Sequence, residues 1–232
     1  MNPLRTLLPI LAISAFLPIS VSADNLPTTA AEQKGLKPAA VLQDLMDGNK
    51  RYLDGKLTAP NVKERIAASA KGQYPKATIL SCLDSRVPVE QIFDQGIGDI
   101  FVGRVAGNVE NEDQLGSMEF AAKVAGVKLV MVLGHEACGA VKGACDHVEL
   151  GNLTHLLKKI DPAVEAVKGF EEKDRNSKNA DFVQKVVLQN VRQTVADIRS
   201  RSEVLAAMEK AGEIKIVGAM YSLTDGKVTL LD

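Results

Sequence analysis

The sequence is poor in aromatic residues and cysteine, and it carries no excess of either charge. None of its 232 residues is tryptophan, and aromatic residues make up only 4%. Three cysteines are too few for the disulfide framework of a small secreted scaffold. The 28 Lys and Arg residues are balanced by 29 Asp and Glu residues, so no excess of positive charge indicates a nucleic-acid partner. With 46% hydrophobic residues, the chain is typical of a globular protein with one sizeable core.

The most apolar stretch of the chain stands at its N-terminus. Within residues 1–23, Arg5 precedes an apolar run, and the segment ends in the small-residue pattern Val21-Ser22-Ala23. This order predicts a secretory signal peptide that is cleaved after Ala23. The alternative, a membrane anchor, fits less well because the run is short and contains two prolines. We therefore expect an exported protein, periplasmic or extracellular, with no membrane partner after cleavage.

The rest of the chain alternates short apolar runs with helical patterns. Residues 24–37 predict a flexible leader, and residues 38–232 predict a single α/β domain. Apolar runs of strand length occupy residues 77–82, 99–105, 127–133, 214–220 and 228–231. The last run follows the turn at Asp225-Gly226 and is predicted to be a short antiparallel strand. This alternation favours a central, mostly parallel sheet flanked by helices.

Helical patterns fill the segments between these runs. An N-terminal helical arm begins at Pro38, and an additional helical segment before the last strands covers residues 152–212 almost entirely. In that segment an apolar stripe from Val183 to Ile198 predicts packing on the core. Shorter helical patterns cover residues 62–71, 88–93, 112–125 and 138–147.

Residues able to bind a metal follow two of the predicted strands. Cys82 ends the first strand, and His135 and Cys138 follow the third. Since parallel strands place their carboxyl ends at one edge of the sheet, neighbouring strands would bring these side chains together. Two thiolates and an imidazole suit zinc, and three protein ligands leave the open fourth position of a catalytic site. The alternative is a Cys82–Cys138 disulfide with His135 uninvolved.

Two charged residues lie directly after Cys82. Arg86 can hold Asp84 by a bidentate ion pair, which would keep the carboxylate ionised beside a metal. The alternative is an ordinary salt bridge within a loop. The third cysteine, Cys145, is predicted to be a small buried apolar residue, and His147 and His155 to be surface residues.

The motif Cys82-x-Asp84-Ser85-Arg86, followed by His135-x-x-Cys138-Gly139, resembles that of the β-class carbonic anhydrases. The likeness also includes residues 98–108 and covers roughly residues 38–222. It implies one zinc ion per chain held by Cys82, His135 and Cys138, and a homodimer or homotetramer. It implies Asp84 and Arg86 as the catalytic pair, with Asp84 as the fourth zinc ligand in a closed state. Val87 and Gly139 would line the substrate pocket.

The resemblance implies reversible hydration of carbon dioxide to bicarbonate by attack of zinc-bound hydroxide. Members with an accessory bicarbonate pocket carry Trp where this chain has Ile79, although Arg104 matches another part of that pocket. The same ligands would serve a zinc hydrolase acting on carbon disulfide or carbonyl sulfide, or a non-catalytic exported zinc-binding protein. The Asp84–Arg86 pair disfavours the non-catalytic protein. The sequence assigns no role to Gln95.

Overall fold

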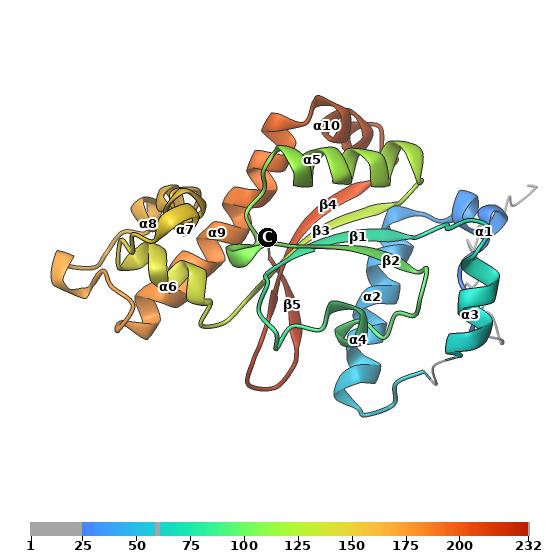
Figure 1. Cartoon of the computed structure of the whole chain (residues 1–232), viewed down its shortest axis with the longest axis horizontal. Coiled ribbons are helices and arrows are strands. Elements are labelled where there is room, and N and C mark those ends of the chain that lie inside the picture. The colour runs from blue at the N-terminus through green and yellow to red at the C-terminus, as the bar shows by residue number, and fades with distance from the viewer. Residues whose placement is uncertain (1–24, 59–60, 232) are drawn as a thin grey trace, which may run out of the picture.

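The computed structural model describes residues 25–58 and 61–231, and its centre is a five-stranded sheet of order β2-β1-β3-β4-β5 (Figure 1). The last strand, β5, is antiparallel to β4, and the other neighbours are parallel. The predicted mostly parallel sheet is therefore confirmed. The strands are β1 (Ala77–Ser81), β2 (Ile100–Arg104), β3 (Leu129–His135), β4 (Lys215–Tyr221) and β5 (Val228–Leu231).

Burial differs between the inner and outer strands. Every residue of β1 and β3 is buried, because helices cover both faces of the sheet. This explains why their sequences are continuous apolar runs rather than alternating patterns. Strand β2, at the edge, is only half-buried.

One face of the sheet is covered by the N-terminal part of the chain. Pro38 opens α2, as predicted, and Leu45 of α2 packs with Phe93 in the core on this face. The helices of this part are α1 (Ala30–Gly35), α2 (Pro38–Leu53), α3 (Val62–Ser69) and α4 (Val89–Ile92).

The predicted flexible leader, residues 24–37, needs correction because it contains α1. Thr29 and Glu32 form a capping box that begins this helix. The buried side chain of Gln33 donates hydrogen bonds to the carbonyl oxygens of Pro75 and Ala125, at 2.6 and 2.8 Å. The helix is thereby fixed to the amino-terminal end of the sheet.

The opposite face is covered by the long helix α9 and its neighbours. The valine stripe of α9 is buried in the larger core cluster, which confirms the predicted packing. The elements of this layer are η1 (Ala106–Asn108), α5 (Glu112–Glu119), the π-helical turn η2 (Phe120–Val124), α9 (Ala180–Arg201) and α10 (Glu203–Lys210).

Three short helices lie beyond the carboxyl ends of the strands, opposite α1 and α3 (Figure 1). They are α6 (Gly139–Cys145), α7 (Gly151–Leu157) and α8 (Asp161–Ala166). The expectation that residues 152–212 are almost entirely helical was wrong for residues 167–179, which contain only the 3₁₀ turn η3 (Glu172–Asp174). There Arg175 donates hydrogen bonds to the carbonyl oxygens of Val164 and Val167, so a side chain satisfies the end of α8.

Among the described residues, no helix combines the length and the apolar character that crossing a bilayer requires. The signal peptide expected at residues 1–23 lies outside the described residues.

Candidate metal centre

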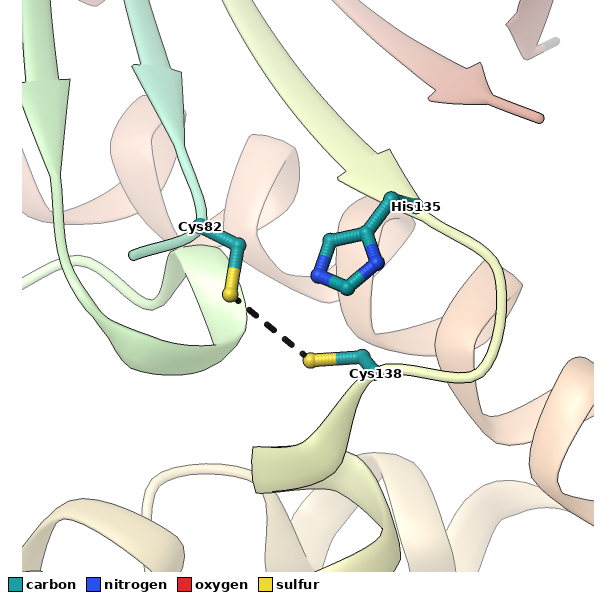
Figure 2. Close-up of side chains that lie close together, drawn as sticks. All are labelled: Cys82, His135 and Cys138. Atoms are coloured by element: carbon teal, nitrogen blue, oxygen red, sulfur yellow. Dashed lines mark hydrogen bonds between the residues drawn. The ribbon is translucent and has the colours of Figure 1, made fainter. Parts of the chain in front are cut away.

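The three predicted metal ligands meet at the carboxyl end of the sheet. Ser81 of β1 pairs with Leu133 of β3, so the ends of these neighbouring strands lie side by side. Cys82 follows β1, His135 ends β3, and Cys138 directly precedes α6 (Figure 2). All three are buried, and their ligand atoms lie within 4.8 Å of one another.

The distance between the two sulfur atoms distinguishes the readings that the sequence left open. Cys82 Sγ and Cys138 Sγ are 3.8 Å apart, and both cysteines are free. A disulfide would place the sulfurs about 2.05 Å apart. Two thiolates bound tetrahedrally to one zinc, each at about 2.3 Å, would lie about 3.8 Å apart. The geometry therefore fits a shared metal ion.

His135 presents a free nitrogen to the same point. Its Nδ1 donates to the backbone carbonyl of Glu136 at 2.9 Å, so in the neutral ring Nε2 is the nitrogen without a proton. Nε2 is buried and has no hydrogen-bond partner within the described part of the chain. A bound cation would satisfy this atom, so the ring is prepared as a ligand.

The electrostatic surroundings favour a thiolate at Cys82. A hydrogen bond with Cys138 lowers the pKa of Cys82 to about 4 against the opposing effect of burial, and His135 and the Gly107 N–H also lower it. The same hydrogen bond raises the pKa of Cys138, and burial and the nearby charge of Cys82 raise it further. A divalent cation that binds both sulfurs would hold both as thiolates.

Asp84 and Arg86 form a bidentate pair beside this cluster. Asp84 Oδ1 accepts from Arg86 Nε at 2.9 Å, and Oδ2 accepts from Nη2 at 2.7 Å. These hydrogen bonds from Arg86 hold the pKa of Asp84 well below its usual range. Oδ2 also lies 3.7 Å from His135 Nε2, so an ionised carboxylate stands next to the ligand atoms.

Arg104 has a structural role at the site that the sequence did not predict. It ends β2 opposite Ser81, and its Nε donates to the carbonyl oxygen of Cys82 at 3.0 Å. Its Nη2 donates to the carbonyl oxygen of Asp84. One guanidinium thus holds both ends of the segment that carries the first ligand and the carboxylate. The sequence feature that could have indicated this role is the position of Arg104 at the end of a predicted strand.

The remaining predicted residues lie in different surroundings. Val87 is fully buried in the core cluster on the α2 face, and Ile79 belongs to the same cluster. Gly139 is exposed at the first position of α6. The pocket-lining roles of Val87 and Gly139 stay predictions. Cys145 is 2% exposed in the larger core cluster, as expected of a small buried apolar residue.

Two further residues support the site from a distance. Glu136 accepts a hydrogen bond from the Leu223 amide at 2.9 Å, which ties the loop after His135 to the turn before β5. Asn190 of α9 donates to the carbonyl oxygen of Gly107 at 2.8 Å. No local motif identifies Asn190, since it lies 83 residues from its partner.

Fold and side-chain cluster together define an α/β protein with a Cys₂His set that could hold a metal ion. Residues 77–228 match the profile of the carbonic anhydrase family. Carbonic anhydrase 2 of Mycobacterium tuberculosis is 37% identical over 201 residues, which are 84% of this chain and 93% of that protein. The chain belongs to the β class of the carbonic anhydrases, which are lyases.

Solved structures of this class have the same fold. The β-carbonic anhydrase CafA of Aspergillus fumigatus superposes with a TM-score of 0.62 at 25% identity, covering 84% of this chain and 89% of that one. A chain from the crystal structures of two tetrameric β-carbonic anhydrases of Sordaria macrospora gives a TM-score of 0.63 at 20% identity, covering 83% of this chain and 94% of that one.

Proposed function

We propose that the protein catalyses the reversible hydration of carbon dioxide to bicarbonate with one zinc ion held by Cys82, His135 and Cys138. The observation that carries this is the meeting of three buried ligand atoms within 4.8 Å. When bound, zinc lowers the pKa of water toward neutrality and so supplies a nucleophile at neutral pH. Family membership supports the same reaction.

Asp84 is proposed to orient the attacking oxygen. Because its carboxylate is ionised and lies beside His135 Nε2, it can accept a hydrogen bond and fix the direction of the oxygen lone pair. Arg86 occupies both carboxylate oxygens, which keeps Asp84 beside the ligand atoms rather than among them. Arg104 fixes the backbone on which both Cys82 and Asp84 stand.

The deciding experiment combines metal analysis with kinetics on the purified protein. We expect one zinc per chain and rapid carbon dioxide hydration by stopped flow, with slow or no turnover of carbonyl sulfide and carbon disulfide. Faster turnover of either sulfur compound would identify the protein as a hydrolase of that substrate. Tightly bound zinc without any turnover would identify a non-catalytic zinc-binding protein.

We also propose that the protein is a homodimer or a pair of dimers joined along β2. The outer edge of β2 has no partner strand among the described residues. Beside it, a groove of about 790 Å³ includes Phe101, Gln114 and Phe120 in its lining. Phe120 is 52% exposed and nearby Val124 is 70% exposed, which is costly for a monomer. The tetrameric relatives support assembly.

Light scattering of wild type and of Phe120→Glu tests this assembly. We expect a multimer for wild type and a smaller species for the variant, because a charge would be buried in the interface. A monomeric wild type would contradict the proposal.

Export is the last part of the proposed function. The order of charge, apolar run and small residues in residues 1–23 supports a periplasmic or extracellular location. Fractionation of the producing cells, with the mass of the mature N-terminus, tests it. An uncleaved chain in the cytoplasm would contradict export.

A further inference from the structure

The long helix α9 lies close to the sheet because two strand positions have no side chain. A Cβ at Gly134 of β3 would collide with Val191 of α9. A Cβ at Gly218 of β4 would lie 2.9 Å from another methyl group of Val191, closer than atoms pack. Val191 therefore sits directly on two neighbouring strands. This close approach brings Asn190, the preceding residue of α9, to the carboxyl end of the sheet.

Asn190 is connected to a ligand sulfur through one residue. Its side chain is 2% exposed, and its Nδ2 donates to the carbonyl oxygen of Gly107 at 2.8 Å. The N–H of the same Gly107 donates to Cys82 Sγ at 3.3 Å. The two hydrogen bonds form a chain from the helix amide to the sulfur.

Gly107 is held in an orientation that other residues would not adopt. Its φ of +73° lies in the left-handed region, which glycine enters without strain. An added Cβ would also stand 2.7 Å from Ile160 Cδ1. Ile160 thus confines the backbone of η1 on one side of Gly107. The hydrogen bond from Asn190 fixes the carbonyl oxygen of Gly107.

We propose that Asn190 is a positioning residue of the metal centre, which orients Gly107 so that its N–H donates to the Cys82 sulfur. A hydrogen bond to a thiolate withdraws negative charge from it and fixes the direction of its lone pairs. Asn190 itself touches neither the ligand atoms nor the substrate. This inference rests on the proposed zinc site and adds a residue on α9 that tunes it.

The test compares Asn190→Leu with Asn49→Leu in the full-length protein. Asn49 is a matched control on α2: it is 3% exposed and donates to the carbonyl oxygens of Ile92 and Gly226, at 3.2 and 3.0 Å. Both variants lose a buried amide, so both should be less stable. Only Asn190→Leu should weaken zinc binding, by about tenfold to a hundredfold in competition with a chelator.

The absorption spectrum of the cobalt(II)-substituted protein is a measurement that a loss of stability alone does not change. We expect the sulfur-to-cobalt charge-transfer band of Asn190→Leu to shift relative to wild type, and that of Asn49→Leu to stay in place. If Asn190→Leu does not fold, Asn190→Ala removes the same hydrogen bond with less steric change. Unchanged zinc affinity and an unchanged cobalt spectrum in a folded Asn190→Leu or Asn190→Ala protein would overturn the proposal.

The outcomes separate this inference from the proposed function. A wild-type protein that binds zinc tightly but does not hydrate carbon dioxide would contradict the proposed activity, and the role of Asn190 would stand on the binding data. A wild-type protein that binds neither zinc nor cobalt would overturn both.

Discussion

At the amino-terminal end of the sheet charged side chains are paired with one another, whereas at the carboxyl end three buried polar atoms have no hydrogen-bond partner in the described part of the chain. Those three atoms are His135 Nε2, Ser81 Oγ and Asn108 Nδ2. A buried polar atom without a partner destabilises a fold. Of the three, His135 Nε2 lies within 4.8 Å of the two cysteine sulfurs, so a cation bound by this cluster would satisfy it.

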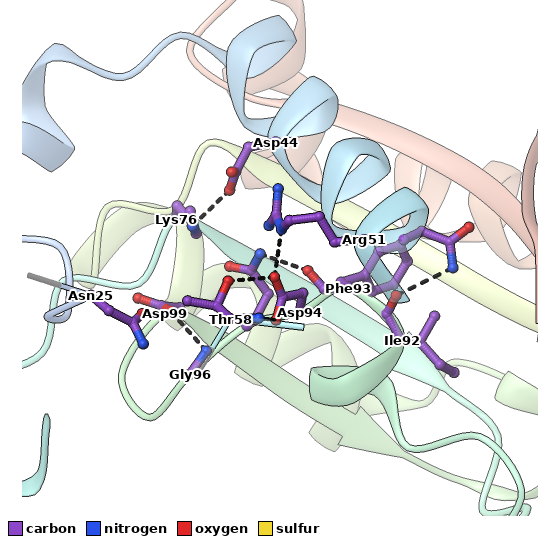
Figure 3. Close-up of polar contacts among 12 residues, drawn as sticks. Asn25, Asp44, Arg51, Thr58, Lys76, Ile92, Phe93, Asp94, Gly96 and Asp99 are labelled. Atoms are coloured by element: carbon purple, nitrogen blue, oxygen red, sulfur yellow. Dashed lines mark hydrogen bonds and ion pairs between the residues drawn. The ribbon is translucent and has the colours of Figure 1, made fainter. Parts of the chain in front are cut away.

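The amino-terminal end shows the opposite arrangement (Figure 3). Lys76 and Asp44 pair at 2.6 Å, and the Gly96 amide donates to Asp99 Oδ2 at 2.8 Å. The same Asp99 oxygen lies 2.5 Å from Nη2 of the buried Arg65. Within the described residues, two buried atoms at this end also lack a hydrogen bond: Gln95 Oε1, and Arg65 Nη2, which has only its ion pair with Asp99. These contacts fix the N-terminal helices to the sheet, so substitutions at the two ends should affect different properties.

The largest effect is expected from removing a ligand at the carboxyl end. In Cys138→Ala we expect zinc content to fall to near zero and hydration to fall to background, because two remaining ligands bind zinc weakly. Cys145→Ala is the control, since this cysteine is buried away from the cluster. Mass spectrometry of the metal and stopped flow measure both effects. Full zinc occupancy in Cys138→Ala would contradict the role of Cys138 as a zinc ligand.

At the other end, Arg65→Met should cost stability and leave the metal site intact. It leaves the Asp99 carboxylate buried without its cation, which typically destabilises a fold by about 3–5 kcal/mol. Urea unfolding measures the loss, and zinc affinity of the folded variant should equal that of wild type. Adding Asp99→Asn should recover part of the stability. A large loss of zinc affinity in folded Arg65→Met would show that the two ends are coupled.

A smaller effect is expected from Asp84→Asn, which keeps the ligands and removes the acceptor. We expect hydration to fall by about a hundredfold with zinc retained, because the amide cannot provide an ionised carboxylate. Asp146→Asn is the matched control, since Asp146 bonds Ser177 away from the cluster. Equal activity of Asp84→Asn and wild type would remove Asp84 from the mechanism.

The smallest effect concerns the acid stability of the amino-terminal end. Burial raises the pKa of Asp94, but hydrogen bonds from Thr58 and Arg51 outweigh it and lower this pKa overall. The stabilisation is therefore present above the unfolded pKa of about 3.9 and is lost as pH falls through the lower folded pKa. Unfolding of Asp94→Asn should show a deficit at neutral pH that closes below about pH 4. A deficit independent of pH would contradict this.

The sequence predicted the strands and the clustering of Cys82, His135 and Cys138 for a shared physical reason. β1 and β3 are buried on both faces, so each appears as an apolar run, and ligands at their ends follow from the parallel order. The β-class motif lies within those two loops. Local sequence was thus sufficient for both.

What the sequence did not predict depends on distant contacts. The helix α1 is anchored by Gln33 to residues 42 and 92 positions away, and its polar sequence resembled a linker. After α8, Arg175 donates to the carbonyl oxygens of Val164 and Val167 from eleven and eight residues along the chain, a contact that helical spacing does not predict. Asn190 lies within the span of the apolar stripe of α9, and only the tertiary packing of this helix shows what its amide contacts.

The bare backbone at Gly218 has a consequence for natural variation in this protein. The position holds no ligand and lies two strands away from β1, so a change to alanine would count as conservative by chemistry alone. A methyl group there would nevertheless lie 2.9 Å from Val191 Cγ1, so the packing of the helix that carries Asn190 would have to shift. With Asn190 in the proposed role, a substitution at this glycine would weaken metal binding although the position lies outside the ligand cluster.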